Sequence, residues 1–200
     1  MRLAGRAPDD KTSKTVGSGA QPMGFHHVAI AVKDAKATHA FYTQAMGFKL
    51  VKVEVGELPG VPGGWMKHFF YDTGGDGMIA FWDLHGATLP EDWSPAIADG
   101  LGLPHWSNHI AFDADSLEAL EEIKNRWLEQ GHDVMEIDHG WCSSVYTDDP
   151  NGILVEFCTT TREFDESDAK EALELFDADH PEPKNPPISR FHRAVDRGER

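Results

Sequence analysis

The sequence has few cysteines and no long hydrophobic run, and each shortage excludes a class of protein. Its two cysteines, Cys142 and Cys158, are too few for a disulfide framework or a thiolate zinc site. No apolar run approaches the roughly 18 residues that a membrane helix needs, and residues 1–22 lack the apolar core of a secretory signal. We therefore expect a cytoplasmic protein with no membrane partner.

Basic residues are also scarce. Lys and Arg number 18 against 34 Asp and Glu, which gives a net charge of −16 with histidine neutral. Such a charge repels nucleic acid and anionic lipid, so we expect neither as a partner. The 200 residues are 40% hydrophobic, which suits one globular domain with tails. Histidine is abundant, with 11 copies.

The hydrophobic pattern predicts the order β-α-β-β-β twice. An alternating strand, a helix that Asp34 caps and Gly47 ends, and three further strands form the first unit, at about residues 24–84. A long connection with several Pro and Gly residues, 85–106, follows it. A second unit, at about residues 107–158, repeats the order with a strongly periodic helix.

The repeat is visible in the residues as well as in the pattern. Residues 27–30 (HVAI) match residues 109–112 (HIAF), and an Asp-Gly or Asn-Gly turn precedes the last strand of each unit. Repeated units of this kind bury each other's sheets. We therefore expect an α+β fold of paired βαβββ modules.

The two ends of the chain differ in composition from the repeat. Residues 1–22 are polar and rich in Gly, Ser and Pro, which is typical of a flexible arm. Residues 161–200 are acidic and Pro-rich, and contain one amphipathic helix at about Phe164–Phe176. We expect residues 23–160 to form a single domain, with 161–200 as a C-terminal extension.

Two histidines and one glutamate form the strongest candidate site. His27 and His109 occupy equivalent positions on equivalent strands, and Glu156 lies in the apolar last strand of the second unit. A carboxylate among such neighbours is costly to bury unless it is paired or metal-bound. Two imidazoles and a carboxylate on one face of a metal form the facial triad of non-haem Fe(II) oxygenases, which leaves coordination positions open. We predict these three residues as metal ligands.

The segments FHHVAIAVKD…FYTQAMGF and NHIAFDADS…DDPNGILVEF resemble the vicinal oxygen chelate superfamily over about residues 24–160. This superfamily includes glyoxalase I, fosfomycin-resistance enzymes, bleomycin-binding proteins, methylmalonyl-CoA epimerase and type I extradiol dioxygenases. The resemblance implies two curved sheets that form a metal-binding cleft, with His27, His109 and Glu156 around a divalent metal. It also implies a small-molecule substrate with vicinal oxygens, and we expect a homo-oligomer.

A fourth ligand distinguishes some members from others. Glyoxalase-like and epimerase-like members are similar in having an acidic residue in the last strand of unit one. Aligning the turns that precede the two last strands puts Phe81 opposite Glu156, so we expect no ligand there. Asp83 lies two residues on, on the same strand face as Phe81, and a register shift would bring it to the metal.

Extradiol ring-cleaving members are similar to this chain in two further places. They carry a Tyr ten residues before the Glu ligand, as Tyr146 precedes Glu156, and a His shortly before that Tyr, here His139. The first hypothesis is therefore an extradiol-type dioxygenase that takes a catechol-like substrate and O₂. In it, His139 shuttles a proton and Tyr146 hydrogen-bonds the substrate oxygen.

Two alternatives stay open. One keeps the metal but changes the reaction to a lyase, isomerase or epoxide-opening transferase of the glyoxalase or fosfomycin-resistance type. The other is a metal-free binding protein of the bleomycin-resistance kind. Fe(II) is the metal we expect, while Mn(II), Zn(II), Ni(II) and Co(II) also suit imidazole and carboxylate ligands.

Overall fold

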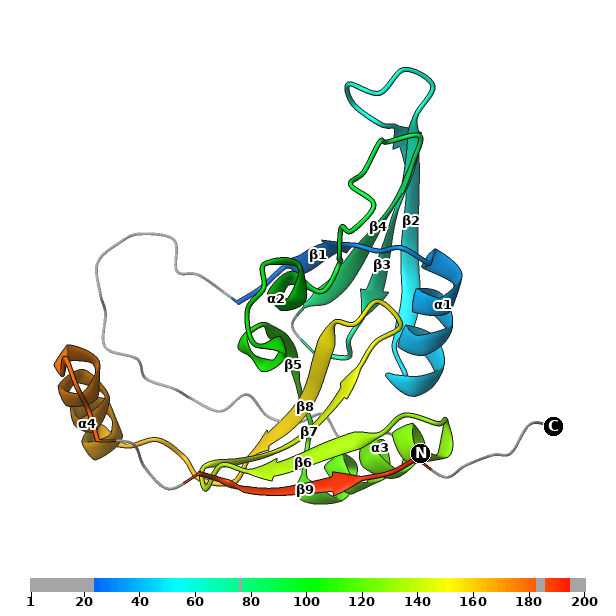
Figure 1. Cartoon of the computed structure of the whole chain (residues 1–200). Helices are drawn as coiled ribbons and strands as arrows, with labels where there is room; N and C mark the ends of the chain where they lie inside the picture. Colours follow the sequence, from blue (N-terminus) through cyan, green and yellow to red (C-terminus); the bar gives the residue numbers. More distant parts are fainter. Residues whose placement is uncertain (1–23, 76, 183–185, 195–200) are drawn as a thin grey trace, which may run out of the picture.

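The computed structural model describes residues 24–75, 77–182 and 186–194 (Figure 1). The predicted arm, residues 1–22, lies outside this part of the chain. Within it, no helix is long and apolar enough to cross a membrane. Two sheets, each with a helix beside it, form the body (Figure 1), which confirms the predicted α+β fold of paired βαβββ modules.

The first module has the predicted β-α-β-β-β order. Asp34 caps its helix by accepting hydrogen bonds from two backbone N–H groups at 2.9 Å, and Gly47, with a φ of 77°, ends it in a conformation that suits glycine. The sheet order is β1-β4-β3-β2, with β1 parallel to β4 and the other pairs antiparallel. The elements are β1 (His27–Ala31), α1 (Ala35–Ala40), the π-helical turn η1 (Phe41–Ala45), β2 (Lys49–Glu57), β3 (Trp65–Asp72) and β4 (Met78–His85).

The second module repeats this order after a connection that contains two short helices. The helix α3 begins after Ser116, whose hydroxyl accepts a hydrogen bond from Ala119 N at 3.1 Å. The four strands of the module have the order β5-β8-β7-β6, with β5 parallel to β8. The elements are α2 (Ile97–Gly100), η2 (His105–Ser107), β5 (His109–Asp113), α3 (Leu117–Glu129), β6 (Val134–Asp138), β7 (Cys142–Asp148) and β8 (Leu154–Thr160).

The C-terminal extension contributes a helix and an additional strand. The helix α4 (Glu166–Asp177) forms where the sequence predicts one, and it stands apart from both sheets (Figure 1). The strand β9 (Ile188–His192) was not predicted; it pairs antiparallel with β6 as the fifth strand of the second sheet. Glu136 on β6 holds it, because its carboxylate accepts from Arg190 at 3.1 Å and lies 2.9 Å from His192.

One hydrophobic core joins the two modules. The rings of Phe48 and Phe112, one from each module, lie 4.9 Å apart between centroids. The indole of Trp127 on α3 is fully buried and donates to the carbonyl of Ala45 at 3.1 Å. The helix-covered face of each sheet therefore points into this core. We call the opposite face of each sheet its outer face.

Candidate metal centre

Glu156 and His109 lie side by side on the outer face of the second sheet. Glu156 sits in the middle of β8 and is 5% exposed, while its strand neighbours Val155 and Phe157 point into the core. The register places Glu156 beside Ala111 of β5, two residues after His109. The imidazole Nε2 of His109 lies 3.1 Å from Glu156 Oε2. The two predicted second-module ligands are thus brought together.

A backbone carbonyl fixes the orientation of the His109 ring. His109 Nδ1 lies 3.2 Å from the carbonyl oxygen of Trp106 in η2. A carbonyl oxygen only accepts, so Nδ1 donates in this contact, and Nε2 is the nitrogen that faces the carboxylate. A metal-bound histidine commonly has this arrangement, with its second nitrogen bonded to a carbonyl or carboxylate.

Tyr146 and His139 complete a polar group around this pair. Tyr146 on β7 is the register partner of Glu156, and its ring centroid lies 6.0 Å from that of His109. The hydroxyl of Tyr146 lies 3.0 Å from His139 Nε2. Burial, with the charge of Glu156, raises the pKa of Tyr146 well above its usual value, so the phenol stays protonated and able to donate.

His27 lies on the outer face of the first sheet, apart from the other two predicted ligands. Its Nδ1 is 2.8 Å from Nδ1 of His26, and its ring contacts Phe70 at 5.5 Å and His68 at 6.2 Å between centroids. Across residues 24–75, 77–182 and 186–194, no three His, Cys, Asp or Glu side chains are grouped closely enough to hold a metal ion. One chain therefore presents the predicted triad in two parts.

The structure corrects the prediction about the fourth position. Ala29 pairs with Ala80 in the first module as Ala111 pairs with Glu156 in the second, so the equivalent of Glu156 is Ala80 and not Phe81. Phe81 is fully buried in the core. The alignment from the turns was one residue out, and a shift of one residue moves a side chain to the other face of a strand.

Asp83 is two residues beyond Phe81 and therefore shares the core side of β4. Its carboxylate lies 3.4 Å from Lys67 Nζ and 2.9 Å from His85 Nε2. Asp83 thus lies on the opposite face of the first sheet from His27. Ala80 carries no donor atom, so the first module supplies no acidic ligand at this position.

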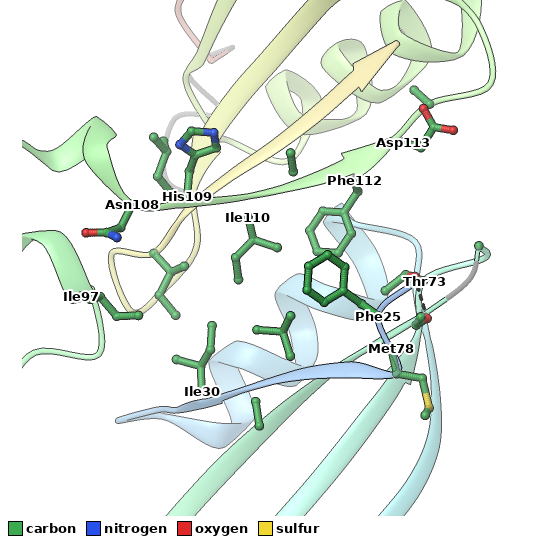
Figure 2. Close-up of a pocket in the computed structure, with 18 of the residues that line it drawn as sticks. Phe25, Ile30, Thr73, Met78, Ile97, Asn108, His109, Ile110, Phe112 and Asp113 are labelled. Carbon is green, nitrogen blue, oxygen red and sulfur yellow. Dashed lines mark hydrogen bonds between the residues drawn. The ribbon is translucent and has the colours of Figure 1, made fainter. Parts of the chain in front are cut away.

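A large pocket lies between the two modules, next to His109. It has a volume of about 1010 Å³ and is bounded by β1 on one side and β5 on the other. Figure 2 shows Ile30 pointing toward Ile110 and Phe25 lying beside Phe112 across this space, while His109 points to the other side of β5. No sequence pattern predicts this pocket, because its walls come from strands about 80 residues apart in the chain.

The donor atoms fit a divalent metal at the second module. Two ligands bound next to each other at about 2.1 Å from a metal lie about 3 Å apart, which is the separation of His109 Nε2 and Glu156 Oε2, 3.1 Å. An imidazole and a carboxylate suit first-row divalent metals. His109 has the outer hydrogen bond that orients a ligand, to Trp106.

Comparison with known proteins agrees with the fold. The sequence profile of the Glyoxalase/Bleomycin resistance protein/Dioxygenase superfamily matches residues 24–157. Comparison with curated proteins gives no significant match.

Among solved structures, a glyoxylase/bleomycin resistance protein/dioxygenase domain from Frankia sp. is 18% identical with a TM-score of 0.52, over 70% of this chain and 99% of that one. A lactoylglutathione lyase from Agrobacterium tumefaciens is 22% identical with a TM-score of 0.46, over 70% and 96% of the two chains. A fosfomycin resistance protein from Listeria monocytogenes is also 22% identical, with a TM-score of 0.47, over 70% of this chain and 96% of that one. The Frankia domain shows the shared fold.

Proposed function

Since the chain belongs to the Glyoxalase/Bleomycin resistance protein/Dioxygenase superfamily, we propose that it is a divalent-metal enzyme of the extradiol dioxygenase type. The proposed ligands are His27, His109 and Glu156. The proposed substrate is an aromatic ring with two vicinal hydroxyl groups, and the second substrate is O₂. The observation that carries this choice of reaction is the His139–Tyr146 contact of 3.0 Å beside the His109–Glu156 pair.

A second copy of the chain completes the proposed metal site. His27 and the His109–Glu156 pair lie on outer faces that point away from the core joining the modules, so they do not converge within one chain. A two-fold dimer places the outer face of sheet 1 of one copy against the outer face of sheet 2 of the other, and it forms two equal sites.

A bound divalent metal supplies charge that lowers the pKa of a coordinated diol and holds it in place. The protein residues then have separate tasks. Tyr146, protonated because its pKa is raised, donates a hydrogen bond to a substrate oxygen. His139, within 3.0 Å of that hydroxyl, takes a proton from the diol and returns it to the ring-opened product.

The reaction balances with O₂ as the only oxidant. The carbon–carbon bond next to the diol breaks, the O–O bond breaks, and both oxygen atoms enter the product. The ring carbons are oxidised as O₂ is reduced. No further reductant is required.

Anaerobic loading with Fe(II), followed by catechols and O₂, tests this proposal. We expect uptake of one O₂ per substrate and the yellow chromophore of a ring-opened product. Turnover of glyoxalase or fosfomycin-type substrates without O₂ contradicts the dioxygenase proposal and leaves a metal enzyme of the other type. Failure of the purified dimer to bind any divalent metal contradicts both and leaves a metal-free binding protein.

A further inference from the structure

Beside His27, the outer face of the first sheet carries a continuous stack of rings. His68 and Phe70 come from β3 and Trp82 from β4, and strand alternation places them opposite the core residues of the same strands. The His68 imidazole is stacked on Trp82, with centroids 3.5 Å apart and planes 11° apart. The ring of Phe70 also contacts His68, with centroids 4.1 Å apart. The Phe70 and His27 rings are 5.5 Å apart between centroids.

The same register positions in the second module hold different residues. Phe70 pairs with Ala80 as Tyr146 pairs with Glu156, and His68 pairs with Trp82 as Ser144 pairs with Cys158. The first module is therefore aromatic where the second is polar. In the proposed dimer, the outer face of the second sheet is polar and carries the proposed chemistry. The outer face of the first sheet, from the other copy, is aromatic and lies opposite it.

His68 is the imidazole in this stack of rings, and one of its nitrogens lacks a hydrogen-bond partner. The residue is 7% exposed, and its Nε2 is buried with no hydrogen-bond partner among the described residues. Each ring nitrogen of an imidazole can donate or accept a hydrogen bond, depending on where the proton lies. Buried polar atoms are nearly always paired in native proteins. The missing partner therefore comes from outside the described residues.

We propose that His68, Phe70 and Trp82 form the recognition wall for the substrate of the proposed site. The substrate ring lies against Phe70 and Trp82, while a further hydrogen-bonding substituent on that ring pairs with the His68 imidazole. The substrate class is then a catechol with an additional polar group. This inference rests on the proposed function, because it needs the shared cleft in which a metal holds the two vicinal oxygens.

The wall fits a ring better than a small aliphatic ligand. Aromatic faces gain from stacking or edge contacts with a second ring, by about 0.5–1.5 kcal/mol beyond the area they bury. A site built to hydrogen-bond a substituent also discriminates against analogues that lack it, because its own polar group is otherwise left unpaired. Trp82 and Phe70 supply the first effect, and His68 supplies the second.

Binding of substituted catechols to the Co(II)-loaded dimer without O₂ tests this wall. The probes are 3,4-dihydroxybenzoate and 2,3-dihydroxybenzoate, which carry a polar substituent, and catechol and 4-methylcatechol, which do not. We expect His68→Phe to weaken binding of at least one dihydroxybenzoate about tenfold, the loss of one hydrogen bond, and to change the affinity of catechol less than twofold. His68→Gln, which keeps a donor and an acceptor, restores most of the loss.

The chain provides a matched control in His85. Its imidazole is also stacked on an indole, that of Trp65 at 3.8 Å between centroids, but it lies on the core side of β4, where its Nε2 is 2.9 Å from Asp83. We expect His85→Phe to leave all four affinities unchanged. Trp82→Leu, tested beside it, weakens all four probes, because it removes the ring surface.

Two results would overturn the recognition wall. One is equal loss in His68→Phe and His85→Phe, and the other is unchanged affinity for both dihydroxybenzoates in His68→Phe and His68→Gln. Oxalate, a small ligand with two oxygens and no ring, separates this failure from failure of the proposed function. If the wild-type dimer binds neither Co(II) nor oxalate, the proposed function fails. The wall is then judged with the same probes on the metal-free protein, where His68→Phe must still lower dihydroxybenzoate affinity.

Discussion

His109 Nε2 lies 3.1 Å from Glu156 Oε2, and the ring nitrogen on the other side of His109 is held by the carbonyl of Trp106. Neither residue is near the other in the chain, and the contact exists because β5 and β8 are parallel neighbours. The carboxylate of Glu156 is 5% exposed and interacts with the imidazole of His109 and the hydroxyl of Tyr146. We propose that a cation binds between the two donor atoms of this pair.

Glu156→Gln should weaken metal binding by more than about 100-fold, since even outer-shell changes cost 10–100-fold. The amide keeps the size of the carboxylate but not its charge, so the fold should remain. Titration calorimetry with Co(II) or Mn(II) measures the loss. Metal at 100-fold excess over Kd should stabilise the wild type by about 2.7 kcal/mol, and chelator should remove this gain.

Cys158→Ala is the control for Glu156→Gln, because Cys158 is two residues away on the same face of β8. Burial raises the pKa of Cys158 to about 11, which keeps its thiol protonated and unsuited to bind metal. Its metal affinity should equal that of the wild type. A chelator-independent melting temperature together with normal metal binding by Glu156→Gln would show that the triad assignment is wrong.

Mixing two inactive variants tests whether the site is shared between copies. His27→Ala and Glu156→Gln each lack one ligand in every site. If subunits exchange at random, half of the dimers are mixed and each contains one intact site, so about one quarter of all sites recover metal. Equilibrium dialysis of the mixture measures this. Ligands that all come from one chain would give no recovery, and two copies of the same variant serve as the baseline.

His139→Ala should retain metal and lose turnover by about 100- to 10,000-fold, the range for removing a general acid–base group. The side chain is partly buried and contacts Tyr146, so its loss removes the proposed proton carrier and leaves His109 and Glu156 in place. Steady-state O₂ uptake with catechol measures kcat. Tyr146→Phe should likewise bind metal normally, and weaker metal binding in either variant would place that residue among the ligands instead.

His105 makes stability depend on pH. Its Nε2 lies 2.7 Å from Asp148 and its Nδ1 3.1 Å from Asp99, so it ties the connection between modules to the β7–β8 turn. The hydrogen bond to Asp148 is the largest cause that raises the pKa of His105 above 6.5, with Asp99 adding to it against the effect of burial. The stabilisation is therefore complete below pH 6.5 and lost as the pH rises through the folded-state value.

Chemical denaturation at several pH values measures this effect against His105→Gln. The difference in unfolding free energy should be at most about 1 kcal/mol, because the site is partly exposed, and it should shrink above neutral pH. His180→Gln, an exposed position in the C-terminal extension, should show no such trend. A His105→Gln difference that grows with pH would contradict the ion-pair account.

Local chemistry in the sequence was enough for the elements and their order. Asp34 and Ser116 bind the first backbone N–H groups of their helices, and the glycine after the first helix adopts a positive φ, as their residue types require. Alternation along β8 separates Glu156 from Val155 and Phe157, which are buried in the core. These effects act over a few residues, so a pattern reports them directly.

Tertiary structure alone decided how the two modules meet and which residues share a face. The strand β9 depends on pairing with β6, 54 residues away, where Glu136 binds Arg190. The equivalence of Ala80 with Glu156 depends on strand register, which a turn alignment places only to within a residue. The stacking of His68 on Trp82 depends on the pairing of β3 with β4. Packing through the helix-covered faces separates His27 from His109 within one chain, because the free energy of burying a common core outweighs any preference of three polar side chains for one another.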